Sequence, residues 1–591
     1  MSRVTQLLKD VFVPVPPLKP TGKSQEGRTV EIATSTSAPV DGPPAKDEKN
    51  IVNYELQTDI SSEVDLYDVG HTHRSLKNRH IQLIGIGGTI GVGLFVNLST
   101  QLHKSGPLAL FLGCVVWSLP ILAVTAACAE MVCYLPIPSP FIRLSERCVD
   151  EAFSFMTGWN FWVLECALIP FELTLFNTLI HFWRNDYSPA IPIALQLAVY
   201  FLINVSAVKY YGETEFWLSI GKVILALGLM MFTFVTMVGG NPLHDVYGFR
   251  NWQPPIAEYI HTGALGRFQA FLGAVITFSY LIAGPEYVSM SAGEVVNPRK
   301  ILPSAFKQVA YRLTIFFVGG SLAMGTVCPW NDPKLVAAIE QGTAGAGASA
   351  YIIAMSNLKV RVLPHIVNGL LLTAAFSAGN SYTYCSSRSL YGMSLEGKAP
   401  RIFSHCNKAG VPIYAVCLSL CWGFLAFLQL SENSATVLSW IVNLVTASQM
   451  INFLSILVTY LHFRRAVSKQ GIDREAFPFK AWWQPYISIA AFITIFCMVW
   501  VQGYEVFLPG DWSVETFLFC YLMIFIDAGL FLFWKILKRT KYVNPMDADL
   551  VSGLDEVEAH ERHLARMIEI NGKPVKRWYN RIVDFLFGDQ E

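Results

Sequence analysis

Charge is scarce in this sequence. Only 15% of its 591 residues are Asp, Glu, Lys or Arg, whereas ordinary soluble domains have roughly 25%. Hydrophobic residues make up 53%, so the chain cannot cover a water-exposed surface and a soluble globular protein is excluded. Because Lys+Arg and Asp+Glu both number 44, the net charge gives no reason to expect a nucleic-acid partner.

The sequence also lacks the patterns of metal sites and enzymes. Its twelve cysteines show no metal-type spacing and fall mostly in apolar runs, where free Cys packs like a small apolar residue. No nucleophile and base occur in an arrangement typical of catalysis. We therefore expect no enzyme and no metal or other cofactor. The first 70 residues contain no apolar signal-peptide core, so the first membrane span is expected to direct targeting.

Long apolar runs are what the sequence does contain. A transmembrane helix needs about twenty mostly apolar residues to cross a hydrocarbon core about 30 Å thick. Such runs occupy residues 81–101, 107–129, 155–180, 191–208, 216–238, 268–292, 309–328, 363–385, 412–430, 438–461, 486–508 and 514–534. They predict an all-α integral membrane protein with about twelve transmembrane helices in residues 76–540.

The distribution of basic residues predicts the orientation in the lipid bilayer, because Lys and Arg favour cytoplasmic loops. Clusters such as Arg464, Arg465 and Lys469 fall between spans that an inside N-terminus would place in the cytoplasm. Both termini are therefore expected to be cytoplasmic. Residues 1–75 are predicted to be a disordered tail, since they offer few large apolar residues to offset the entropy of ordering. Residues 541–591 are predicted to form a cytoplasmic C-terminal tail.

Two of the apolar runs contain helix-breaking residues. Residues 85–93 include five glycines, each of which weakens a helix by roughly 1 kcal/mol relative to Ala. These glycines indicate either close helix packing or a locally unwound helix whose free N–H groups can hold an anionic group.

The sixth run contains Gly284-Pro285-Glu286, where proline should interrupt the helix. Breaks in the first and sixth spans suggest two five-helix repeats of inverted topology, with a substrate site where the breaks meet.

Ionisable residues inside membrane spans are costly and usually face a cavity or a partner. The runs contain Glu130, Glu165, Glu172, Lys222, Glu286 and Asp527. Glu165 and Glu172 are seven residues apart, which places them within about 20° on one helix face. We interpret them as lining one cavity; structural hydrogen bonds to neighbouring helices are the alternative. For Asp527, which lies outside the proposed repeats, a structural role is favoured.

Several motifs resemble the signatures of fungal amino-acid permeases, which belong to the amino acid–polyamine–organocation superfamily. They are IGGTIG at 86–91, VKYYGETEFW at 208–217, AGEVVNPRK at 292–300 and GVP at 410–412. Within this family, AEMVC at 129–133, WNFW at 159–162, IPFE at 169–172 and SAGN at 377–380 resemble the yeast plasma-membrane branch linked to carnitine and polyamine uptake.

The resemblance implies a leucine-transporter-like fold of 5+5 inverted repeats plus two extra helices. It also implies that the first-span segment Gly88, Thr89, Ile90, Gly91 and Gly93 and the sixth-span break Gly284, Pro285 and Glu286 hold the substrate. Lys222 matches the fifth-span lysine of proton-coupled relatives, and we add Glu130 as a second proton-coupling candidate. Glu165 and Glu172 complete the predicted substrate site.

The sequence departs from the family pattern at three places. The family's usual Gly-Thr-Glu is Gly284-Pro285-Glu286 here, the position of the usual aromatic gate holds Ile282, and Glu165 replaces an apolar or aromatic residue. The expected substrate is therefore an amine such as carnitine, a polyamine or a basic amino acid, moved by proton-coupled alternating access across the plasma membrane. The alternative is a transporter-like sensor of carnitine and polyamine uptake. By the same resemblance, Lys9, Lys19 and Lys23 are candidate acceptors for a ubiquitin ligase.

Overall fold

The computed structural model describes residues 74, 76–87, 91–184, 186–206, 208–340, 349–430, 434–510 and 512–571. The predicted disordered tail, 1–75, lies almost entirely outside this part of the chain, as do Gly88, Thr89 and Ile90 of the predicted substrate site. Within it the fold is helical, with one isolated β-bridge, between Leu76 and Val295.

The α-helices follow one another along the chain as α3 (Asn78–Gly87), α4 (Asn97–Tyr134), α5 (Pro140–Cys148), α6 (Glu151–Ile180), α7 (Ala190–Val205), α8 (Val208–Met237), α9 (Gly263–Leu281), α10 (Pro285–Met290), α11 (Pro298–Arg312), α12 (Gly319–Val327), α13 (Pro333–Glu340), α14 (Ala350–Asn357), α15 (Leu363–Leu395), α16 (Ile413–Cys421), α17 (Ser434–Lys469), α18 (Tyr486–Val501), α19 (Val514–Lys538) and α20 (Leu554–Asn571). Short helices η1 (Val92–Leu94), η3 (Ala292–Glu294), η4 (Leu313–Val318) and η7 (Trp422–Leu430) complete or link several of them.

Among the described residues, the apolar runs of the sequence lie mainly on helices. Eight helices in the described part of the chain are long and apolar enough to cross a membrane, and α7 and α18 are shorter apolar helices. One of these eight stretches covers residues 92–134. It includes the end of the first predicted span and the whole of the second. The all-helical fold is confirmed, whereas the twelve membrane spans and their arrangement as 5+5 inverted repeats stay predictions.

The first predicted span is interrupted, as its glycines suggest. Helix α3 ends at Gly87, and Gly91 has an extended backbone before η1 begins. A second irregularity separates the first span from the second: Gly106 has φ 74°, and a Cβ built on it would lie 2.7 Å from the backbone N of Ala257. Only glycine fits this turn, because a side chain would meet both a strained φ and a neighbouring backbone.

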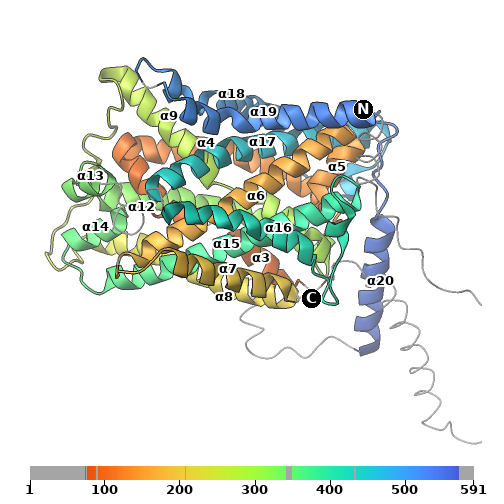
Figure 1. Cartoon of the computed structure of the whole chain (residues 1–591), viewed down its shortest axis with the longest axis horizontal. Helices are drawn as coiled ribbons and strands as arrows, with labels where there is room; N and C mark the ends of the chain where they lie inside the picture. The colour runs from red at the N-terminus through yellow and green to blue at the C-terminus, as the bar shows by residue number, and fades with distance from the viewer. Residues whose placement is uncertain are drawn as a thin grey trace, which may run out of the picture.

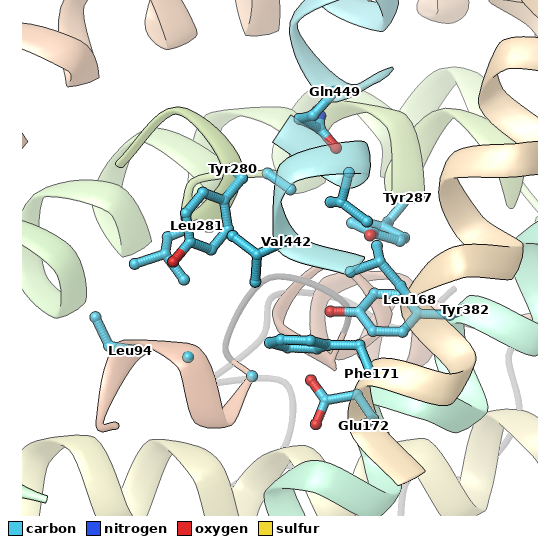
Figure 2. Close-up of a pocket in the computed structure, with 14 residues that line it drawn as sticks. Leu94, Leu168, Phe171, Glu172, Tyr280, Leu281, Tyr287, Tyr382, Val442 and Gln449 are labelled. Atoms are coloured by element: carbon cyan, nitrogen blue, oxygen red, sulfur yellow. The ribbon is translucent and has the colours of Figure 1, made fainter. Parts of the chain in front are cut away.

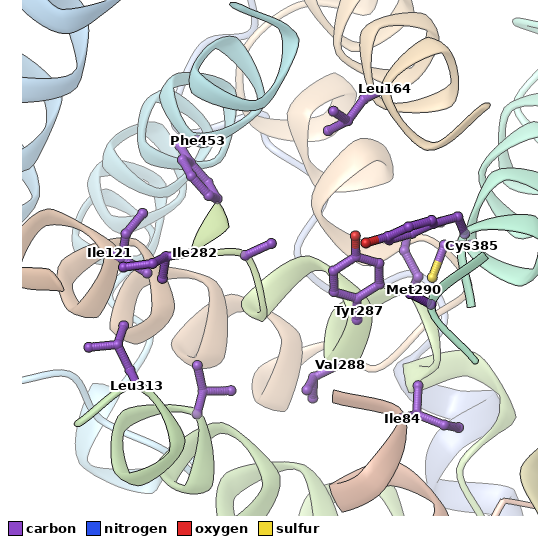
Figure 3. Packing of buried hydrophobic residues seen from close by; sticks show 14 of the residues in the cluster. Ile84, Ile121, Leu164, Ile282, Tyr287, Val288, Met290, Leu313, Cys385 and Phe453 are labelled. Carbon is purple, nitrogen blue, oxygen red and sulfur yellow. The ribbon is translucent and has the colours of Figure 1, made fainter. Parts of the chain in front are cut away.

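The sixth predicted span breaks at the predicted place. Helix α9 ends at Leu281 and α10 begins at Pro285, with Gly284 between them at φ 156°. Proline is well suited to the first turn of a helix, where its missing N–H would have no partner. Helix α10 is only six residues long, all of them buried, and Figure 3 shows its Tyr287 beside Met290 and Cys385 in the hydrophobic core.

The long helices run roughly along one direction and form a single bundle (Figure 1). Helix α6 is central and packs against α15, α17 and α19, while α4 packs against α9 and α18. Helices α13 and α14 lie at one end of the bundle, and α5 and α20 lie at the other (Figure 1). At this second end, His560 of α20 contacts the carbonyl of Val296 at 2.9 Å.

Opposite ends of the bundle should face opposite sides of the membrane. We expect 333–348 to be external and 297–307 and 397–410 to be cytoplasmic, as the basic residues predict. Cysteines placed singly at Lys334 and Lys408, both exposed, test this in intact cells whose protein lacks other reactive thiols. An impermeant thiol reagent should label position 334 only; labelling of position 408 alone would reverse the orientation.

Candidate ligand-binding site

A pocket lies where the two interrupted spans meet α6, α15 and α17. Figure 2 shows Glu172, Phe171 and Tyr382 close together in this pocket, with Tyr280 and Leu281 across from them. The fourteen lining residues are Gly91, Gly93, Leu94, Leu168, Phe171, Glu172, Tyr280, Leu281, Ala283, Tyr287, Tyr382, Val442, Val445 and Gln449. The breaks of the first and sixth spans therefore meet at one cavity, as the inverted-repeat hypothesis requires.

Glu172 is the acidic group of the pocket. It lies on α6 directly after Phe171 and is 1% exposed. Its Oε1 would be 2.9 Å from a Cβ built on Gly91, so the carboxylate lies against the backbone where the first span is interrupted. Its Oε2 has no hydrogen-bond partner within the described structure. A buried carboxylate oxygen without a partner is costly, and a ligand that carries a cation would remove this cost.

Aromatic rings form much of the remaining wall. Phe171, Tyr280, Tyr287 and Tyr382 all line the pocket, and the ring centroids of Tyr287 and Tyr382 are 6.1 Å apart. None of the fourteen lining residues is Lys, Arg or His. Because an aromatic face attracts a cation within about 6 Å of its centroid, these rings and Glu172 together favour a positively charged group.

Lys222 lies beside this pocket. It is on α8, is fully buried, and interacts electrostatically with Glu215 and Glu172. Glu215 accepts hydrogen bonds from Ser377 and from Ser219, the latter at 3.2 Å. The structure thus links the predicted coupling lysine to a carboxylate of the pocket.

Glu286 and Glu165 occupy a different part of the core from the pocket lining. Glu286 accepts hydrogen bonds from the backbone N of Gly284 at 3.2 Å and from Nε2 of Gln449 at 2.8 Å, and so supports the start of α10. Glu165 lies on α6 near Glu286 and Tyr287. Both Glu165 oxygens are buried and lack a hydrogen-bond partner among the residues that the structure describes. Glu165 is therefore a buried acid beside Tyr287 and outside the pocket lining.

Glu130 has a set of partners of its own. Its carboxylate accepts hydrogen bonds from Nε and Nη2 of Arg474 at 2.5 and 2.7 Å, from the Tyr460 hydroxyl at 3.0 Å and from the Ala481 backbone N at 2.9 Å. These partners belong to α17 and to the loop after it. The two predicted proton-coupling residues, Glu130 and Lys222, thus lie in separate networks.

Polar networks join the helices at the α5 and α20 end of the bundle. The backbone N of Leu76 donates to the carbonyl of Glu294 at 2.9 Å, which ties the start of α3 to η3. The Glu294 carboxylate accepts hydrogen bonds from Arg388 Nε at 3.1 Å and from the Tyr384 hydroxyl. Arg79 of α3 pairs with Glu213 of α8. These contacts join α3, η3, α8 and α15 at this end of the bundle.

The structure brings together some of the predicted site residues and adds others. Gly91, Gly93 and Glu172 line the pocket, whereas Gly284, Pro285, Glu286 and Glu165 do not, and Gly88, Thr89 and Ile90 lie outside the described residues. The aromatic residues and Gln449 were not predicted. Phe171 and Leu168 could have been found, because they lie one and four residues before Glu172 on the same helix.

Comparison with known proteins gives a consistent result. The amino acid permease family matches residues 80–544. The chain is similar to the general amino acid permease AGP2 of Saccharomyces cerevisiae, with 53% identity over 499 residues, 83% of this chain and 84% of that protein. It is also 36% identical to the proline-specific permease of the same yeast, over 84% of this chain and 80% of that one. The lysine/arginine permease CAN1 of Candida albicans is 32% identical, over 85% and 90%.

Proposed function

Because the chain belongs to the amino acid permease family, we propose that it is a proton-coupled plasma-membrane permease for amines that include carnitine, polyamines and basic amino acids. The observation that carries the substrate class is the pocket, which combines the unpartnered Oε2 of Glu172 with four aromatic rings and has no basic side chain in its lining. A carboxylate attracts any ammonium, and aromatic faces favour quaternary and alkylated ammonium groups. The proline and lysine/arginine permeases among the relatives are named for amino acids, which also carry an ammonium group.

Alternating access requires that each end of the pocket open in turn. The contacts between Leu76 and Glu294 and between Arg79 and Glu213 join α3 to η3 and to α8 at one end. In our proposal these contacts separate when the substrate is released to the cytoplasm. The breaks at Gly87 and Gly284 act as hinges, because short helix ends can rotate without bending a whole span.

Proton coupling is proposed to use Lys222. Its electrostatic interaction with Glu172 joins it to the group that would bind the substrate ammonium. A lysine can serve as a reversible proton carrier when it is buried beside carboxylates. Glu130, with its own network around Arg474, stays a second proton-coupling candidate that would act at a distance from the pocket.

The two α6 carboxylates provide the test of substrate class. We expect Glu172→Gln to weaken carnitine by roughly 1 to 3 kcal/mol, about five- to a hundredfold, because a charged partner of the ligand's ammonium is lost, whereas Glu165→Gln, outside the pocket lining, should have a smaller effect. The carba analogue of carnitine, in which a tert-butyl group replaces the trimethylammonium, should be affected much less by Glu172→Gln. Binding to the purified protein gives the ratio, and Glu258→Gln, at an exposed position, is the control. Equal losses for both ligands would mean that these carboxylates support the bundle and do not recognise charge.

A sensor of carnitine and polyamine uptake is the second candidate function. It is favoured by the docked C-terminal segment: besides the His560 contact, Arg299 of α11 pairs with Glu558 and Glu561 of α20, at 3.5 and 3.4 Å. Movement of α11 would therefore be transmitted to α20. A sensor would bind these amines without moving them, so ligand binding in the absence of flux would select this function.

A further inference from the structure

The segment that follows α19 crosses one end of the bundle. We call residues 543–561 the C-terminal strap; they include the first turns of α20. Figure 1 shows α20 lying across the end of the bundle where α5 is found. The basic residues predict that this end faces the cytoplasm. The strap contacts two groups of elements there, and the two sets of contacts differ in kind.

The first part of the strap is anchored in the bundle. Gln470, which directly follows α17, donates from its Nε2 to the carbonyl of Ala548 at 2.8 Å. Leu550 is fully buried, and both Ala548 and Leu550 belong to the hydrophobic core. Detachment of this part would expose apolar surface to water, which is unfavourable. Residues 543–553 are therefore expected to stay attached.

A tight turn joins this anchor to α20. Arg147 of α5 donates from Nη1 to the carbonyl of Ser552 at 2.7 Å. Gly553 has φ 96°, and a Cβ built on it would lie 2.9 Å from Cγ2 of Ile137, so the turn favours glycine. Helix α20 begins at the next residue, Leu554. Few residues therefore separate the anchor from α20, and α20 cannot move far while the anchor and the turn are in place.

The second part of the strap, at the start of α20, contacts the link between η3 and α11. The Nε2 of His560 lies 2.9 Å from the carbonyl of Val296. Arg299 pairs with Glu558 and Glu561 at 3.5 and 3.4 Å, and its side chain is 30% exposed. Partly exposed ion pairs contribute little to stability. This end of the strap is therefore the more easily released of the two.

The strap connects the anchor to elements that lie beyond the proposed hinges. The link between η3 and α11 follows the break at Gly284. Arg74, which precedes α3 and its break at Gly87, interacts electrostatically with Glu556 and Glu561 of α20. When these elements swing away from α5 and α17, the contact between α20 and the η3–α11 link must separate, because the short turn keeps α20 near the anchor.

We propose that the C-terminal strap is an autoinhibitory contact, and that its α20 end must leave the η3–α11 link before the pocket opens to the cytoplasm. The anchored end stays bound throughout, because it buries apolar residues whereas the α20 end depends on partly exposed ion pairs. This inference rests on the proposed function, to which it adds a restraint on the step that releases substrate.

Cross-links at the two ends of the strap test the proposal. In a protein without other reactive thiols, Arg299→Cys with Glu558→Cys is bridged by a short bismaleimide in detergent and then reconstituted. This bridge should abolish exchange of labelled carnitine across liposomes. The matched control is Arg147→Cys with Ser552→Cys, whose bridge at the anchored end should leave exchange as in the unbridged protein. Equal effects of the two bridges would overturn the proposal.

A single charge reversal releases the strap without a cross-link. Glu558→Arg places like charges beside Arg299 and should speed carnitine exchange about two- to fivefold, the scale of an exposed ion pair. Glu569→Arg makes the same change at an exposed position further along α20 and should leave the rate unchanged. Equal rates in the two variants would contradict the proposal.

A flux-independent measurement separates this inference from the proposed function. Val557 of α20 is 1% exposed, so a water-soluble thiol reagent should label Val557→Cys only when α20 is released. Labelling should be faster with Glu558→Arg than with Glu569→Arg. A protein without flux that shows this difference would contradict transport and retain the strap. Flux that neither bridge slows, with equal labelling rates, would contradict the strap and retain transport.

Discussion

Lys222→Met is expected to abolish concentrative uptake while the protein still reaches the cell surface. Lys222 is fully buried and interacts electrostatically with Glu215 and Glu172. Methionine keeps the length and the apolar stem of the side chain and removes the group that can carry a proton. The variant should bring the substrate only to equal concentrations inside and outside, because the proton gradient would no longer be linked to its movement.

Lys209→Met is the matched control, since Lys209 lies on the same helix and is exposed. It should accumulate substrate as wild type does. The measurement is uptake of labelled arginine into liposomes with an imposed proton gradient, alongside exchange of arginine without a gradient. Unchanged proton-driven accumulation by Lys222→Met would exclude this residue from coupling.

Arg388→Met is expected to destabilise the protein by about 3 to 5 kcal/mol, because it leaves a buried carboxylate without its charge partner. Arg388 and Glu294 are 5% and 2% exposed, and Arg388 also lies over the ring of Tyr384, 4.2 Å from its centroid. The loss should appear as a lower thermal-unfolding midpoint in detergent. It should also loosen the end of the bundle where Leu76 pairs with Val295.

The double variant Arg388→Met with Glu294→Gln distinguishes a lost ion pair from lost packing. Removal of both charges should recover part of the midpoint, since the unpaired carboxylate is gone. Arg184→Ala breaks the exposed pair with Asp186 and should change the midpoint little. A midpoint for Arg388→Met equal to that of Arg184→Ala would show that the buried pair contributes little to stability.

The sequence predicts the architecture well where the physics is local. Proline at 285 and the glycines from 85 to 93 weaken a helix wherever they occur, and both breaks are found. The placement of Glu172 at the pocket could be predicted because it lies in an apolar helix. A carboxylate there is costly unless it faces a cavity or a partner. Twelve spans remain a prediction, because eight stretches among the described residues meet the length and hydropathy expected of a membrane span.

Side-chain partners across the bundle could not be predicted in the same way. Tyr382 lies on α15, about two hundred residues after Glu172, and a tyrosine in an apolar run resembles an ordinary core residue. The sequence pattern assigns Arg312 and Lys398 to cytoplasmic loops, where charged side chains are usually exposed. In the structure Arg312 is buried, and Lys398 is fully buried beside Glu146 and Ser154. Glu286 supports the start of α10 because Gln449 reaches it from another helix. These contacts depend on tertiary packing, which no local pattern encodes.

In our proposal this chain moves amines across the membrane by using a proton gradient. The direct test is uptake of labelled carnitine, spermidine and arginine by the purified protein in liposomes, with and without an inward proton gradient. We predict accumulation of at least one of them above the external concentration when the gradient is present, and only equilibration when it is absent. Absence of flux for all three, in a protein that binds them, would contradict the claim and identify a sensor.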